Sequence, residues 1–174
     1  MNQSPSENWK SAFRSLFNLA VDHYRSGKRG AANYFKPAEI AELATFGYRA
    51  QEMYDFAEDR VKYGEPDLET ALAIAGVRRE YFLQVQGGKL TDQRIDMASL
   101  PPKDASVAGI VWLPRILVKA KAKLRGEMPD DLMYGCGGDR KFFKENNVDP
   151  VKFLRAVWKA NGDDQAVIDF VRQG

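Results

Sequence analysis

Apolar residues recur at steps of three and four along most of the chain, which is the spacing of one face of an α-helix. The first such stripe consists of Phe13, Leu16, Phe17, Ala20 and Tyr24. A polar loop follows over residues 26–33, and Pro37 is well placed to begin the next helix, where its missing N–H costs nothing. Period-two alternation of β-branched residues is not found, so the pattern predicts helices and no strands.

Further helices are expected on both sides of a linker. Gly47 breaks the second helix and a third occupies residues 50–63. Asp67 then caps a fourth helix that ends at about Gln86, because an aspartate side chain accepts from free N–H groups of the first helical turn. Residues 89–108 have few large apolar groups and predict a linker. The helical pattern returns at residues 112–124, 139–145, 149–159 and 163–172.

The two halves of the chain align with a constant shift of one hundred residues, so that the first apolar stripe recurs at residues 113–124 and Tyr34 corresponds to Tyr134. We interpret this register as an internal duplication, with chance similarity of amphipathic helices as the alternative. The interpretation predicts an all-α helical bundle of two diverged repeats, 1–88 and 109–174, packed as one compact unit about a pseudo-two-fold axis. A ligand cleft is then expected between the repeats.

The composition of the chain excludes few classes of protein. A chain of 174 residues with 44% hydrophobic and 29% charged residues is ordinary for a globular protein, and a net charge of +2 is too small to indicate nucleic acid by itself. One cysteine cannot form an intramolecular disulfide, and residues 1–5 do not resemble an export signal, so we expect a cytoplasmic protein. No run of about 20 apolar residues predicts a membrane span, so no membrane partner is expected.

Several pieces of the second half occur in one order with close spacing. They are residues 109–115 (GIVWLPR), the lysines at 119–123 (KAKAK), Tyr134, Cys136, Asp139-Arg140, Phe142-Phe143 and the ending at 163–171. With them, residues 92–173 resemble the bacterial family called domain of unknown function 5069. The resemblance implies a small helical cytoplasmic module, and it implies no activity.

The only cysteine, Cys136, lies among three glycines in the stretch 133–143 (MYGCGGDRKFF). A thiolate is favoured near a helix N-terminus and beside cations such as Arg140, so Cys136 is a candidate nucleophile or substrate contact. No histidine lies in this half to serve as its base, and an inert structural cysteine is the competing interpretation. The glycines could expose backbone N–H groups to an anion, or form a turn into a helix that Asp139 caps.

His23 lies at the edge of its helix's apolar stripe, and Lys123 lies at the equivalent edge in the second half. Both are therefore expected to point toward the shared cleft. A partly buried histidine with a satisfied hydrogen bond is the alternative. Because zinc sites take several histidine or cysteine ligands, one histidine predicts no metal site, and no cofactor motif occurs.

A basic helix begins near Arg115, with no acidic residue between Ala105 and Arg125. Its charge could neutralise phosphates or carboxylates, which makes a nucleic-acid-binding module using residues 114–125 a second functional hypothesis. Helical geometry spreads the cations over both flanks of the apolar stripe, so a solvated basic face is the alternative. The corner at residues 37–63 carries four acids in its second helix that would repel phosphates, which argues against nucleic acid as a partner.

We rank first a cytoplasmic helical protein that binds a small anionic molecule in the cleft between its repeats, with a reaction on that molecule left open. The residues predicted for substrate binding are Lys123, Arg140, Tyr34, Arg115 and Cys136, and those predicted for proton transfer are Tyr134, Asp139 and His23. The third hypothesis is a non-catalytic protein-interaction module. A homo-oligomer is compatible with all three.

Overall fold

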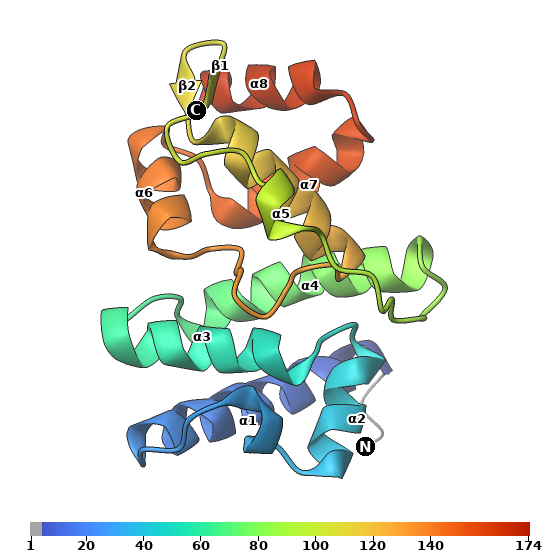
Figure 1. Ribbon diagram of the computed structural model, residues 1–174. Coiled ribbons are helices and arrows are strands. Elements are labelled where there is room, and N and C mark those ends of the chain that lie inside the picture. Colours follow the sequence, from blue (N-terminus) through green and yellow to red (C-terminus); the bar gives the residue numbers. More distant parts are fainter. Residues whose placement is uncertain (1–4) are drawn as a thin grey trace. The chain divides into compact units, whose positions relative to one another are not determined.

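The computed structural model describes residues 5–174, with side chains from residue 8 onward (Figure 1). These residues form eight α-helices, two short 3-10 helices and one two-stranded sheet, which confirms the predicted all-α class. The chain divides into two compact units, the first ending at Leu90 and the second beginning at Thr91. None of the described helices combines the length and the apolar composition that crossing a membrane requires.

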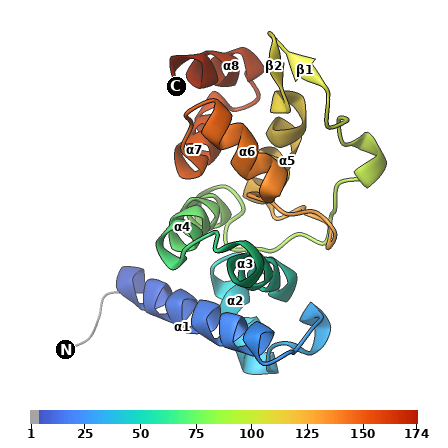
Figure 2. The ribbon, with the colours of Figure 1, turned by 90° about the vertical axis from the view of Figure 1, so that its left-hand side faces the viewer.

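The first unit is an aromatic-rich helical bundle. Its elements are α1 (Pro5–Arg25), η1 (Ala31–Asn33), α2 (Pro37–Thr45), α3 (Ala50–Tyr63) and α4 (Leu68–Gln84). The long α1 packs along α3 and also contacts α4 and α2 (Figure 2). Phe13 lies at the centre of the core, where its ring meets those of Phe46, Tyr48 and Phe56 edge to face. As predicted, Pro37 begins α2 and the Asp67 carboxylate caps α4 by accepting from the Thr70 N–H.

The second unit is a helical bundle with its own, slightly smaller apolar core than that of the first unit. Its elements are η2 (Met97–Ser99), β1 (Ser106–Val107), β2 (Ile110–Val111), α5 (Leu113–Arg125), α6 (Gly137–Glu145), α7 (Pro150–Ala160) and α8 (Asp164–Gln173). Helix α7 packs against both α5 and α8 (Figure 1). Phe142 and Phe143 of α6 meet Phe153 of α7 edge to face. Asp149 and Asp163 cap α7 and α8, close to the starts that the sequence predicts.

Two expectations about residues 89–108 need correction. The segment from Thr91 belongs to the second unit and is bonded to it: the Ile95 N–H donates to the Glu127 carbonyl, and Arg115 donates to the Pro101 carbonyl. The prediction of no strands is also wrong, because β1 and β2 pair antiparallel. Ala108 and Gly109 connect them with φ values of 53° and 79°, as a tight hairpin turn of two left-handed residues requires. Strands of two residues are too short to show alternation.

The duplication stays a prediction, and several local features support it. Helix α2 begins at Pro37 and α6 at Gly137, and both have nine residues. Gly47 and Asn147, which follow these helices, both have positive φ, at 80° and 53°. In each case the next residue donates its N–H back into the helix, from Tyr48 to the Leu43 carbonyl and from Val148 to the Phe143 carbonyl. Each unit thus builds the same helix corner at the same register.

Candidate functional site

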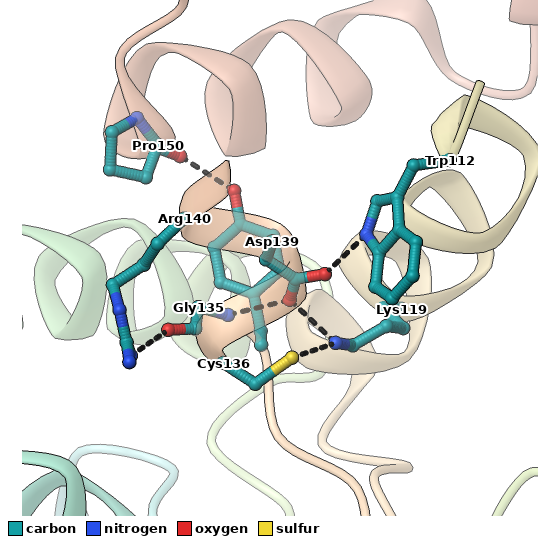
Figure 3. A network of polar contacts seen from close by, with 8 residues as sticks. Trp112, Lys119, Gly135, Cys136, Asp139, Arg140 and Pro150 are labelled. Carbon is teal, nitrogen blue, oxygen red and sulfur yellow. Dashed lines mark hydrogen bonds and ion pairs between the residues drawn. The ribbon is translucent and has the colours of Figure 1, made fainter. Parts of the chain in front are cut away.

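A buried ion pair joins α5 to α6 in the second unit. The Lys119 Nζ atom lies 2.5 Å from Asp139 Oδ2, and the two side chains are 1% and 0% exposed. Asp139 accepts two further hydrogen bonds, from the Trp112 indole N–H at 2.8 Å and from the Gly135 backbone N–H at 2.8 Å (Figure 3). Its carboxylate is therefore held from three sides, which is the condition under which a buried charge is tolerated.

Cys136 completes this cluster at its partly exposed edge. The Lys119 ammonium donates to the Cys136 sulfur at 3.2 Å, and Cys136 as a residue is partly exposed. Cys136 is also the N-cap residue of α6, and within the described chain no side chain caps the first turn of that helix. The sulfur thus lies between a buried cation and the partially positive end of a helix. We name Trp112, Lys119, Cys136 and Asp139 the α6 cluster.

Two backbone features, at Trp112 and at Gly138, position the side chains of the α6 cluster. Trp112 has a φ of 73°, a left-handed conformation that is uncommon for a bulky residue, and it places the indole beside α6. A Cβ atom added at Gly138 would lie 2.4 Å from the Trp112 ring, so only glycine allows this close approach of α6 to the indole. The Arg115 guanidinium lies 5.6 Å from the same ring on its α5 side. Trp112 is therefore packed between α5 and the start of α6.

Two other predicted site residues flank the α6 cluster in structural roles. The Tyr134 hydroxyl donates to the Pro150 carbonyl at 2.7 Å, and burial raises the pKa of Tyr134 well above its usual value. Arg140 Nη1 donates to the Gly135 carbonyl at 2.8 Å, which fastens the loop before α6. Tyr134 is consequently a poor proton donor or acceptor near neutral pH, although the sequence singled it out for proton transfer.

Asp139 does not cap α6 in the way the sequence suggested. It is the third residue of the helix, and its carboxylate accepts from the Gly135 N–H, one residue before the N-cap. Its other contacts point inward to α5. The expectation of a solvated basic face on α5 is likewise wrong for Lys119 and Lys123, because both are buried.

His23 and Tyr34 lie in the first unit, at the end of α1. Their rings meet edge to face with centroids 5.3 Å apart, and the Tyr34 hydroxyl donates to the Ala20 carbonyl at 2.7 Å. Burial raises the pKa of Tyr34 to about 12, so this hydroxyl also keeps its proton near neutral pH. The convergence of His23 with Lys123 stays a prediction, since the two belong to different units.

Sequence reasoning did not single out Trp112 and Lys119 as site residues. Lys119 is one of five cations on α5. It lies three residues after Ile116 and four before Lys123, on the buried side of the helix. This spacing is the sequence signal that could have indicated its burial. Among the described residues, no three His, Cys, Asp or Glu side chains gather as a metal ion would need. The α6 cluster offers instead a thiol, a buried ammonium and uncapped backbone N–H groups.

Comparisons of the chain with models of protein families, with curated proteins and with solved structures give no match. The resemblance of residues 92–173 to the family called domain of unknown function 5069 therefore stays a prediction.

Proposed function

We propose that the protein binds a small anionic molecule beside Cys136, at the N-terminal end of α6. The observation that carries this proposal is the 3.2 Å contact between the buried Lys119 ammonium and the sulfur of Cys136, a partly exposed residue. A molecule that reaches the sulfur comes within reach of that charge and of the uncapped N–H groups of α6. The Lys119 ammonium touches the sulfur directly, and a positive charge at this distance would attract the negative group of a bound molecule.

The first unit supports a functional role for the α6 cluster. One hundred residues earlier, the positions of Lys119, Cys136 and Asp139 hold Leu19, Lys36 and Glu39. There Glu39 accepts from the Lys36 N–H at the surface, and α2 forms without a buried charge. The same helix corner is thus built without a buried ion pair. Because a buried ion pair stabilises a fold less than apolar packing of similar volume, the α6 cluster is better explained by binding than by folding.

Nucleic acid is less well supported as the partner. The Lys121 Nζ atom lies 2.7 Å from the Asp164 carboxylate, Lys119 is paired with Asp139, and Arg115 donates to a backbone carbonyl. The cations of α5 are thus engaged within their own unit. A surface that tracks a phosphate backbone needs several cations in a row that are free to meet it.

Protection of Cys136 from alkylation tests the proposal. Because the chain has one cysteine, the loss of free thiol with iodoacetamide reports on this site alone. We expect inorganic phosphate to slow the reaction relative to chloride at equal ionic strength, by about tenfold at a tenfold excess over its Kd, as mass action requires. The urea-unfolded chain should show no such protection. Equal rates in phosphate and chloride for the folded protein would contradict anion binding beside Cys136.

A further inference from the structure

Arg78 is a buried cation whose hydrogen bonds are incomplete. It lies in the middle of α4 in the first unit, and its side chain is 0% exposed. Nη1 donates to the Gln86 side-chain oxygen at 2.7 Å. The other two nitrogens, Nε and Nη2, are buried and find no acceptor in the described part of the chain. A guanidinium does not lose its proton in proteins, so Arg78 remains charged in this environment.

The surroundings of Arg78 offset its charge in part but leave its hydrogen bonds incomplete. Burial lowers the pKa of Arg78, and the charge of Glu52 acts in the opposite direction. Glu52 already accepts from the Arg49 N–H at the start of α3. The hydrogen-bond partner of Arg78 is a neutral amide, and the Phe82 ring lies 5.3 Å from its guanidinium carbon. Buried donors without an acceptor destabilise a fold, so a further partner is expected for Nε and Nη2.

The two nitrogens without an acceptor define the shape of that partner. Nε and Nη2 lie on the same edge of the planar guanidinium, and their N–H bonds point the same way. This edge matches two oxygens of a carboxylate or a phosphate, which arginine binds through two parallel hydrogen bonds. A single water molecule offers one oxygen and no negative charge.

We propose that Arg78 binds an oxyanion, a carboxylate or a phosphate group, through Nε and Nη2. This site lies in the first unit and is built from residues of α4 and its C-terminal end, so it is separate from the site proposed beside Cys136. The oxyanion supplies the two acceptor oxygens that Nε and Nη2 lack.

Thermal unfolding of the whole chain in sodium chloride, sodium phosphate and sodium acetate at equal ionic strength tests this site. Binding to the folded state raises the Tm, by about 5 °C or more at a hundredfold excess over Kd for a chain of this size. A rise in phosphate assigns a phosphate group, and a rise in acetate assigns a carboxylate. The same Tm in all three salts would overturn the proposal.

Substitutions assign the effect to Arg78. Arg78→Met should lower the rise in Tm by the part that this site contributes, whereas Arg79→Met should keep the whole rise, because Arg79 carries the same charge one residue away and lies against the Trp9 ring at 5.1 Å. If Arg78→Met does not fold by circular dichroism, Arg78→Lys serves instead, since an ammonium keeps the charge without the paired donors. An undiminished rise in the folded Arg78 variant, or an equal loss in Arg79→Met, would contradict the assignment. Protection of Cys136 by phosphate should persist in either Arg78 variant, which separates this test from the one above.

Discussion

Each unit buries a cation on a helix, and the two differ in how that charge is balanced. Lys119 on α5 meets the Asp139 carboxylate at 2.5 Å, and Asp139 is held in turn by Trp112 and Gly135. Arg78 on α4 meets the amide of Gln86, and two of its buried donors have no acceptor among the residues that the structure describes. The comparison separates a charge that the chain neutralises itself, beside a thiol, from a charge for which we propose a partner from outside the chain.

The largest effect is expected from breaking the buried pair. Asp139→Ala leaves the Lys119 ammonium buried without a carboxylate, which should lower the free energy of unfolding of the second unit by about 3–5 kcal/mol. Urea unfolding followed by circular dichroism measures the loss. The matched control is Asp164→Asn, which breaks the more exposed pair with Lys121 on the same helix and should cost about 1 kcal/mol or less. Similar losses in both variants would show that burial of the pair does not matter.

The close approach of α6 to Trp112 is the next contact to test. Gly138→Ala places a Cβ atom against the indole, and overpacking of this kind costs about 1–3 kcal/mol. Gly137→Ala is the control, because its Cβ would meet only the Arg140 Nη2 atom at 3.8 Å, so it should be neutral or slightly stabilising. Stability of both variants is compared by urea unfolding. If Gly138→Ala is as stable as Gly137→Ala, the Trp112 indole does not pack against Gly138 as we describe.

The helix corners of the two units differ at one matched position. Gly47 has a φ of 80°, and a Cβ there would lie 2.8 Å from Phe82 Cγ, whereas Asn147 adopts a φ of 53° in the second unit. We expect Gly47→Asn to destabilise the first unit by about 1–3 kcal/mol, mainly through the clash, and Asn147→Gly to change stability by a few tenths of a kcal/mol. If Gly47→Asn and Asn147→Gly change the Tm by similar amounts, the two helix corners do not differ at this position as we describe.

The smallest effect is expected at the cap of α4. The hydrogen bond from the Thr70 backbone N–H lowers the pKa of Asp67, so its stabilisation is complete above the unfolded pKa of about 4 and is lost as pH falls through the lower folded pKa. Asp67→Ala should cost about 1 kcal/mol at pH 7 and less at pH 3. Asp67→Asn keeps a capping side chain that does not titrate. An unchanged cost of Asp67→Ala between the two pH values, measured by urea unfolding, would argue against the cap.

Local signals predicted the helices because their boundaries are set by residues that act locally. Pro37, Asp67, Asp149 and Asp163 each lie at or next to the first residue of a helix in the structure. The sequence does not predict the hairpin, because two-residue strands are too short to show periodicity. The glycine of Ala108-Gly109 is the one local residue that favours a hairpin turn. The composition of residues 89–108 predicts a linker because few of their side chains are large and apolar, whereas the segment is held by backbone hydrogen bonds such as that from Ile95 to Glu127 and by the buried Leu100.

The candidate sites were harder to predict because they depend on contacts between distant residues. Cys136 and Asp139 were singled out from their glycines and their place before a helix, but the partner Lys119 lies twenty residues from Asp139. Arg78 lies on the buried stripe of α4 with Ala71, Ala75 and Phe82, at steps of four, three and four. That spacing predicts burial of Arg78, and only the structure shows that its hydrogen bonds are incomplete.

The central claim is that the positive charge of the buried Lys119 attracts anions to the Cys136 sulfur. It is tested most directly by the ratio of the alkylation rates of Cys136 with iodoacetate, an anion, and with iodoacetamide, its neutral analogue. We predict that Lys119→Gln lowers this ratio about tenfold, the effect of one charge a few ångströms away, whereas Lys121→Gln on the same helix leaves it unchanged. If Lys119→Gln does not fold, Lys119→Met combined with Asp139→Asn replaces it. An equal ratio in the wild type and the folded Lys119 variant would contradict the account.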